Sequence, residues 1–297
     1  MQSIPPKPDL LNAIGADSQL SKITWERLAS DYEAISKQFH SHFIHATDYQ
    51  HDNAMYHKIR YLELLRRPWR GRVLDVGNDK PFLSYFLRSF NPDSNFETIS
   101  NEIPETPFPL REVDIEREKF PFPDEFFDQI IFTEVIEHLW RNPSFCVFEI
   151  NRVLKVSGEV FVTTPNPCDR HSLVCVLWQA DPNQRSGYFA TLESGHLHLW
   201  TVDKLKRIFS SHGFQIKLAT TRDLYGHTKP DESIEEFISK ISPFRELMNE
   251  TVIVEAVKQA VAPEPVYPLE IFPDGKPVQL AGAILGFIET LTNNPKK

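Results

Sequence analysis

The sequence has few cysteines, few glycines, no excess of positive charge and no long apolar run. Its three cysteines, Cys146, Cys168 and Cys175, are too few for a disulfide framework or a four-thiolate metal site. Lys and Arg number 32 against 41 Asp and Glu, which gives a net charge of −9. Because the chain lacks an overall basic field for phosphate backbones, we expect no general nucleic-acid binding.

Targeting and membrane signals are also missing from this sequence. The first nine residues are polar and contain three prolines, unlike the apolar core of a signal peptide. No run of about 18 uninterrupted apolar residues occurs, so we expect no membrane span. These features favour a cytoplasmic protein. Proline (23) outnumbers glycine (11), which predicts rigid connections between elements.

The N-terminal part of the chain has a helical pattern. Residues 25–65 contain no glycine or proline, and apolar side chains recur there at spacings of three and four: Tyr32, Ile35, Phe39 and Phe43. This periodicity predicts helices with one apolar face. We interpret residues 1–66 as an N-terminal helical cap.

From residue 72 onward, short apolar segments alternate with helical ones. The expected strands are 72–76, 96–100, 126–133, 159–164, 214–219 and 251–258. The expected helices are 81–90, 201–212, 234–248 and a segment that begins near residue 135 and continues through 145–154. We expect Ser157-Gly158 to stop this last helix. Such alternation predicts an α/β domain with an open, mostly parallel sheet covered by helices on both faces. We assign this domain to residues 67–260 and treat 261–297 as a C-terminal extension.

Several short motifs lie where the predicted strands end. The sequence reads VLDVG at 73–77, DIE at 114–116 followed by FPFPDEFFD, EVIEHL at 134–139, and RVLKVSG at 152–158 followed by TTPN. A strand that runs into Asp and Gly at a strand-to-helix turn is typical of a nucleotide-type pocket at the carboxyl edge of a sheet. An acidic residue on the loop between the third and fourth strands of such a sheet can accept a hydrogen bond from an exocyclic amine.

In this order, the motifs resemble those of the class I S-adenosylmethionine-dependent methyltransferases, specifically the small-molecule branch. The resemblance implies a doubly wound, mostly parallel seven-stranded sheet, the Rossmann-like methyltransferase fold. The first motif departs from the family pattern, because Asp79 and Pro81 stand where further glycines are usual. In this respect GNDKPFLSYFL is similar to a glycine-poor variant found in relatives from polysaccharide and sugar-conjugate pathways.

The resemblance implies S-adenosyl-L-methionine as the cofactor and places its contacts at strand ends. The implied contacts are Asp75, Gly77 and Asn78 with the methionine part, Asn101 or Glu102 with the ribose hydroxyls, Asp114 and Ile115 with the adenine, and Glu134 near the methionine end. The implied activity is methyl transfer to a small molecule, with an oxygen atom of a sugar or other secondary metabolite as the favoured acceptor.

An oxygen nucleophile must lose a proton, and a histidine with a pKa near neutrality can take it. Three histidines are candidates by position: His138, His196 and His198. We rank His196 first because the segment before Thr201 is expected to close over the acceptor. A local structural role is the competing interpretation of His138. No motif of metal-ligating spacing is present, so we expect no required metal.

Two other functions remain open at this level. The missing glycines fit a degenerate methyltransferase-fold protein that binds the cofactor without transferring a methyl group. Alternatively, the apolar segment 278–291 and the N-terminal helices fit a module that recruits a partner. Measurable cofactor binding and acceptor-dependent turnover would separate these readings. The sequence identifies neither the acceptor nor the oligomeric state, and a homo-oligomer is left open.

Overall fold

The computed structural model describes residues 32, 57–77, 82–100, 110–177, 179, 198–225, 236, 240 and 245–266. The chain divides into two compact units, Met1–Val266 and Tyr267–Lys297. The second unit lies outside the described residues, as does the predicted apolar segment 278–291. The description below therefore concerns the first unit.

A seven-stranded sheet with the order β3-β2-β1-β4-β5-β7-β6 forms the centre of this unit. The strands are β1 (Arg72–Val76), β2 (Asn95–Ser100), β3 (Leu110–Glu112), β4 (Phe127–Thr133), β5 (Leu154–Pro165), β6 (Phe214–Arg222) and β7 (Thr251–Lys258). Strands β1 to β5 pair in parallel, and β7 runs antiparallel between β5 and β6. The strand order reverses between β1 and β4, which is where open α/β sheets bind ligands.

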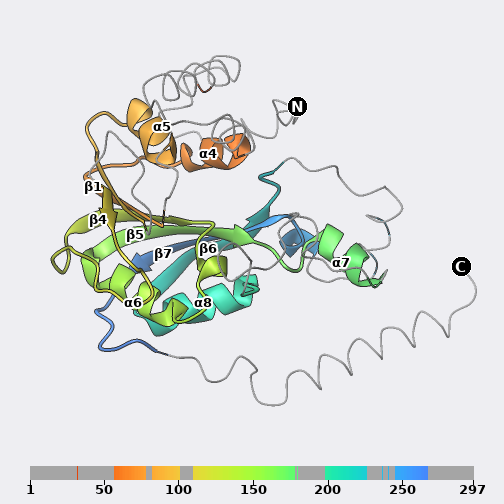
Figure 1. The fold of residues 1–297 in the computed structure, drawn as a ribbon. Helices are drawn as coiled ribbons and strands as arrows, with labels where there is room; N and C mark the ends of the chain where they lie inside the picture. The colour runs from red at the N-terminus through yellow and green to blue at the C-terminus, as the bar shows by residue number, and fades with distance from the viewer. Residues whose placement is uncertain are drawn as a thin grey trace, which may run out of the picture. The chain divides into compact units, whose positions relative to one another are not determined.

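Helices cover both faces of the sheet (Figure 1). The helices are α4 (Lys58–Leu64), α5 (Phe82–Phe90), α6 (Pro143–Val153), α7 (Arg170–Leu177) and α8 (Val202–Ser211), with 3-10 turns η2 (Ile136–His138) and η4 (Arg245–Leu247). Helices α4 and α5 lie on one side of the sheet, and α6 and α8 lie on the other (Figure 1). This arrangement confirms the predicted doubly wound methyltransferase architecture.

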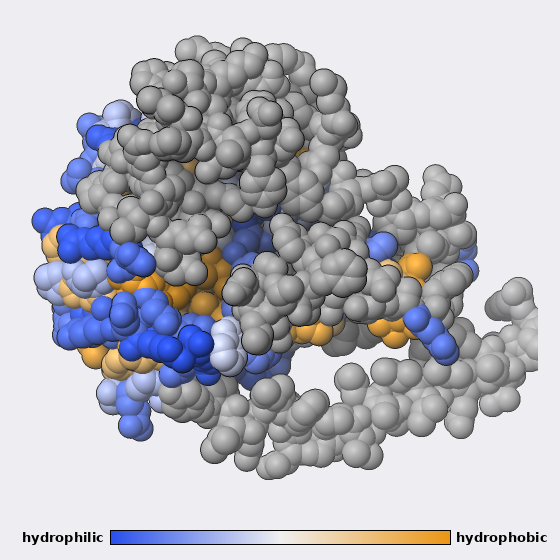
Figure 2. Space-filling view, in the orientation of Figure 1, coloured by the Kyte–Doolittle hydropathy of each residue, from blue (hydrophilic) through white to orange (hydrophobic). Residues whose placement is uncertain are grey.

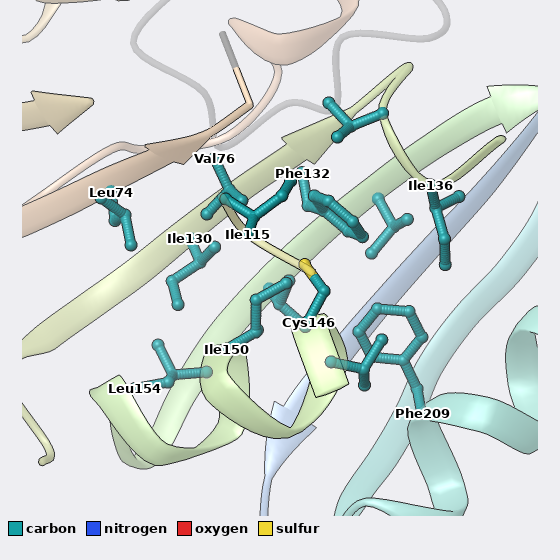
Figure 3. Packing of buried hydrophobic residues seen from close by; sticks show 14 of the residues in the cluster. Leu74, Val76, Ile115, Ile130, Phe132, Ile136, Cys146, Ile150, Leu154 and Phe209 are labelled. Carbon is teal, nitrogen blue, oxygen red and sulfur yellow. The ribbon is translucent and has the colours of Figure 1, made fainter. Parts of the chain in front are cut away.

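The alternation of side chains along the strands produces two apolar layers. In β4, Ile130 and Phe132 join the cluster beneath α6 and α8, whereas Ile131 joins the cluster beneath α4 and α5. Successive residues of a strand point to opposite faces, so one short segment supplies both layers. Figure 3 shows Cys146 and Ile150 of α6 packed into the same cluster as Ile130 and Phe132.

Helix boundaries follow the expected capping chemistry. The Thr201 hydroxyl accepts a hydrogen bond from the Lys204 N–H at 3.2 Å and begins α8. Gly213 follows the end of this helix with a φ of +79°, a conformation that favours glycine. Asn142 caps α6 through the Phe145 N–H at 3.0 Å.

Some predicted boundaries were wrong. The helix expected from about residue 135 is only the η2 turn, and α6 starts anew at Pro143, where proline suits the first turn. Ser157 and Gly158 do not stop this helix, because it ends at Val153 and both residues lie within β5. Strand β3 and helix α7 were not predicted from the sequence.

The described surface is mostly hydrophilic on the face seen in Figure 2, with apolar areas between charged ones. Large apolar side chains are exposed at separate places along the chain: Trp140, Val156, Val176, Leu199 and Val261. None of the described helices is both long enough and apolar enough to cross a membrane.

Candidate active site

The carboxyl ends of β1 and β4 meet at the reversal of strand order. Gly77 follows β1 with a φ of +77°, and its N–H donates to the Ile99 carbonyl at 2.8 Å. A Cβ at this position would lie 2.6 Å from Cγ1 of Val135. The structure therefore gives Gly77 a packing role against the segment after β4, besides the ligand approach that the sequence predicts for it.

Asp75 lies within β1, where its carboxylate is buried and accepts a hydrogen bond from the Ser84 hydroxyl at 2.7 Å. Ser84 is on α5, so this bond joins the first strand to the helix that follows the turn. The predicted contacts Asn78, Asn101 and Glu102 lie outside the described residues, and their roles stay predictions.

Asp114 follows β3, and its side chain is 40% exposed. One carboxylate oxygen accepts the Glu116 N–H at 3.1 Å, and the other lies 3.8 Å from Arg141 Nη1 and 3.9 Å from Arg117 Nε. Ile115 is buried in the core beneath α6 (Figure 3), and its predicted contact with the adenine stays a prediction.

Glu134 immediately follows β4 and has a φ of +55°, which a non-glycine residue adopts only at some cost in conformational energy. Its carboxylate accepts hydrogen bonds from the Thr163 hydroxyl at 2.7 Å and from the Tyr225 hydroxyl. Arg60 Nη1 lies 3.7 Å from the same group. Such residues are characteristic of functional sites, where surrounding contacts hold a strained backbone in place.

Glu137 lies in the η2 turn, three residues further on, and its side chain is almost fully buried. Oε2 accepts the Thr164 hydroxyl at 2.9 Å, whereas Oε1 has no hydrogen-bond partner. Burial raises the pKa of Glu137 to about 7, and its own backbone N–H, the Thr164 hydroxyl and Arg60 limit this rise. A carboxyl group that titrates near neutrality can exchange protons under physiological conditions.

Arg60 of α4 brings a buried positive charge to this edge of the sheet. Its Nε and Nη1 have no hydrogen-bond partner, and only 5% of the residue is exposed. Arg67 also has buried N–H groups without partners, but it forms an ion pair with Glu255 and stacks over Phe161, away from the strand ends. Arg60 is therefore the arginine with unmatched donors next to Glu134.

Two of the three candidate histidines are described. His138 has a half-exposed side chain, and its Nε2 lies 3.9 Å from Glu137 Oε1. The His198 N–H donates to the Glu137 carbonyl at 3.2 Å, so the segment before Thr201 does lie against the η2 turn. His196, the first-ranked candidate base from the sequence, lies outside the described residues.

Several site residues were missed by the sequence analysis. Thr163 and Thr164 belong to the TTPN motif, whose hydroxyls were given no role, and Glu137 was noted only as part of EVIEHL. Arg60 stands in an otherwise mostly apolar helix, which is a usable signal for a buried functional charge. Tyr225 follows β6 in no recognisable motif, and only the fold brings it to Glu134.

The FPFPD and RVLK motifs form a structural network instead of a catalytic one. Arg152 donates to Glu149 at 2.6 and 2.8 Å, to Asp124 at 2.7 Å, and to the Phe120 and Phe122 carbonyls at 2.9 Å each. Glu149 also accepts the Phe120 N–H at 2.7 Å. The two motifs occur together because one side chain ties the loop before β4 to α6.

Comparison with known proteins agrees with this geometry. A family model described as a methyltransferase domain matches residues 40–219, which is more than half of the chain. A methyltransferase of Haloferax volcanii, solved in complex with the Trm112 methyltransferase activator, has 14% identity and a TM-score of 0.51 over 78% of this chain and 97% of its own. A SAM-dependent methyltransferase from Archaeoglobus fulgidus has 18% identity and a TM-score of 0.50 over 71% of this chain and 100% of its own. None of the proteins with curated functions matches this sequence.

The fold and the motifs define a class I methyltransferase, and the chain belongs to the family of S-adenosylmethionine-dependent methyltransferases. The cofactor of this family is S-adenosyl-L-methionine. At identities below one fifth, the two solved structures support the fold alone. The predicted branch, with its glycine-poor first motif, stays a prediction.

The described residues fit this cofactor. Asp114 presents an exposed acceptor at the end of β3, where an adenine amine is expected. At the other end of the site, Arg60 has buried donors that no protein group satisfies, as a bound carboxylate requires. Among the described residues, no group of three or more His, Cys, Asp or Glu side chains is arranged to hold a metal ion. The prediction that no metal is required stays a prediction.

Proposed function

We propose that this protein transfers a methyl group from S-adenosyl-L-methionine to a hydroxyl oxygen of a small molecule, such as a sugar or another secondary metabolite. The observation that carries this proposal is the group of acidic and imidazole side chains at the end of β4. Glu134, Glu137 and His138 lie within one five-residue segment, and His198 is attached to it by a backbone hydrogen bond. A hydroxyl acceptor needs such groups, because its proton must leave as the new bond forms.

The bound cofactor supplies an activated methyl group on a sulfonium. The protein must align the acceptor with that group and exclude water. We assign Asp114 to the adenine amine, Gly77 to the turn beside the methionine part, and Arg60 to the methionine carboxylate. Glu134 is held by Thr163 and Tyr225, so its carboxylate is oriented before any ligand binds.

We assign the removal of the acceptor's proton to one of the histidines. His138 is half-exposed at the strand ends, and His198 lies next to the same turn. His196 stays a candidate from the sequence. Removal of the true base should lower turnover by about 10²- to 10⁴-fold and leave cofactor binding close to normal.

The proposal is tested with the purified full-length chain and S-adenosylmethionine carrying a labelled methyl group. A panel of hydroxyl-bearing sugars and phenols is assayed by mass spectrometry for the added methyl group and for S-adenosylhomocysteine. Calorimetry with S-adenosylhomocysteine measures cofactor binding in parallel. Acceptor-dependent product supports the proposal. Tight binding without transfer to any hydroxyl would favour the degenerate cofactor-binding protein, and absence of binding would favour the module that recruits a partner.

A further inference from the structure

Glu137 and His138 are neighbours in the η2 turn but have opposite surroundings. The Glu137 side chain is 3% exposed, whereas that of His138 is 41% exposed. In a 3-10 turn, with three residues per turn, consecutive side chains point in directions about 120° apart. The turn therefore directs the carboxylate into the protein and leaves the imidazole partly exposed at the surface.

Hydrogen bonds to main-chain carbonyls fix the position of this turn. The His138 N–H donates to the Val135 carbonyl at 2.9 Å, and the His198 N–H donates to the Glu137 carbonyl at 3.2 Å. The Trp200 indole N–H donates to the Ile136 carbonyl at 3.1 Å. Because contacts from outside the turn hold it, the relative position of the two side chains belongs to the fold.

The two oxygens of Glu137 are used unequally. Oε2 accepts the Thr164 hydroxyl, while Oε1 is buried without a hydrogen-bond partner and lies 3.9 Å from His138 Nε2. A buried acceptor without a donor lowers stability, and more so if it is charged. A small rotation of the exposed imidazole would bring Nε2–H within hydrogen-bond distance of Oε1.

We infer that Glu137 is a positioning residue that accepts the Nε2–H of His138 and so leaves His138 Nδ1 as the atom that takes the acceptor's proton. The inference rests on the proposed function. As the oxygen–methyl bond forms, the sulfur–methyl bond breaks and sulfur keeps its electron pair. The hydroxyl proton moves to Nδ1, and the Glu137 carboxylate stabilises the resulting imidazolium.

Other charged or titratable groups act on this pair. Arg60 on α4 lowers the pKa of Glu137 and so favours its carboxylate, against the dominant effect of burial. Glu134 lies at the end of β4 next to Arg60, and its carboxylate accepts hydrogen bonds from the hydroxyls of Tyr225 and Thr163. His198 approaches the turn through its main chain. With the pKa of Glu137 at about 7, the rate should rise as the pH passes through neutrality.

The first test measures the pairing without any turnover. In the full-length protein, NMR titration of the His138 ring should give a pKa that falls by about 1 in Glu137→Gln, because a nearby carboxylate is lost. His212 is buried at the C-terminal end of α8, where its Nε2 accepts the Val266 N–H at 3.0 Å, and its titration should not change. Glu264→Gln, at an exposed position, is the matched control variant and should leave His138 unchanged.

The second test measures whether Glu137 acts through His138. Glu137→Gln should lower turnover by about 10- to 100-fold and remove the rise in rate near pH 7, with little effect on the binding of S-adenosylhomocysteine. The double variant Glu137→Gln/His138→Ala should be no slower than His138→Ala alone, because one residue serves the other. If Glu137→Gln fails to fold, Glu137→Asp replaces it. The shorter side chain keeps the charge but moves it away from His138 Nε2, so the effect of residue 137 on His138 should be lost in the same way.

Three outcomes decide the inference. An unchanged His138 pKa in folded Glu137→Gln or Glu137→Asp overturns it, as does a double variant in which the two losses multiply. A metal requirement at these residues also overturns it. In that case a chelator abolishes turnover, Mg²⁺ restores it, and both single variants need a higher Mg²⁺ concentration, since the two side chains would be metal ligands. If the His138 pKa does fall in Glu137→Gln but the protein methylates no hydroxyl, the pairing is supported and the proposed function is contradicted instead.

Discussion

Two buried arginines of this protein have opposite surroundings. Arg152 is 8% exposed and Arg60 is 5% exposed, so both have given up most of their hydration. Every nitrogen of the Arg152 guanidinium donates to a carboxylate or a carbonyl within 2.9 Å. On Arg60, Nε and Nη1 have no partner, and the carboxylate of Glu134 is 3.7 Å away.

We infer that the difference separates a residue that maintains the fold from one that is prepared to bind a ligand. A buried charge with all of its hydrogen bonds made is tolerated as structure. One with donors left over costs stability, and a bound ligand can recover that cost. The completeness of hydrogen bonding therefore distinguishes the two arginines better than burial or motif membership does.

The largest expected effect is on folding, at Arg152. Arg152→Ala leaves Glu149 buried without its counter-charge and frees the loop before β4. The free energy of unfolding should fall by about 3–5 kcal/mol, the usual cost of breaking a buried pair, as measured by urea denaturation. Arg207→Ala removes an exposed arginine paired with Asp203 and should cost about 0.5 kcal/mol or less. Equal stability of the two variants would contradict the comparison.

The next effect is a pH dependence of stability caused by Glu137. Its pKa rises from an ordinary 4.5 to about 7 in the folded protein, so the folded state holds the proton more tightly than the unfolded one. This stabilisation is complete below pH 4.5 and is lost as the pH rises through 7, a change of about 3 kcal/mol. Glu137→Gln mimics the neutral form and should not show this loss.

The measurement is the difference in unfolding free energy between wild type and Glu137→Gln from pH 4.5 to 8. Other titrating carboxyls, such as Asp124 and Asp128, whose pKa values are lowered, occur in both proteins and cancel in the difference. The variant should gain relative to wild type as the pH rises. A difference that does not depend on pH would show that Glu137 is not held in a desolvated site.

Much of the fold could be predicted because its signals are local. The apolar segment 126–133 and the β-branched segment 251–258 are strands by pattern alone, and Thr201 and Gly213 mark the ends of a helix. Strand β3 spans only Leu110–Glu112, too short for any periodicity. The start of α6 was misjudged because the EVIEHL motif has apolar spacing like that of a helix, whereas Pro143 begins the helix.

The site could be predicted only where its residues lie in family motifs. Asp75, Gly77, Asp114 and Glu134 all lie at or just beyond strand ends as expected. The groups that complete the site come from far along the chain: Arg60 from before the sheet and Tyr225 from after β6. Their meeting at Glu134 depends on the strand order, which local sequence does not encode.

A smaller effect is expected from the second arginine of the comparison. Arg60→Met keeps an unbranched apolar side chain but removes the guanidinium and its donors, so S-adenosylhomocysteine should bind about 10- to 100-fold more weakly, or about 1.4–3 kcal/mol. Stability should fall less than in Arg152→Ala, because Nε and Nη1 of Arg60 make no hydrogen bond that could be lost. An analogue that lacks the amino-acid carboxylate should bind both proteins alike. If Arg60→Met instead unfolded as Arg152→Ala is expected to, the two arginines would not differ in kind.

The smallest effect is expected at Asp114, where the site is open to solvent. Its carboxylate is 40% exposed and lies 3.8 Å from Arg141 and 3.9 Å from Arg117, so solvent and cations already satisfy part of it. Asp114→Ala should therefore weaken S-adenosylhomocysteine binding by only about 1 kcal/mol, at the low end for a charge-assisted bond. Calorimetry with the inosine counterpart, which has a carbonyl in place of the adenine amine, makes the test specific. Wild type should prefer the adenine form, the variant should lose this preference, and Asp203→Ala on α8 should keep it. A preference that survives in Asp114→Ala would assign adenine recognition to another group.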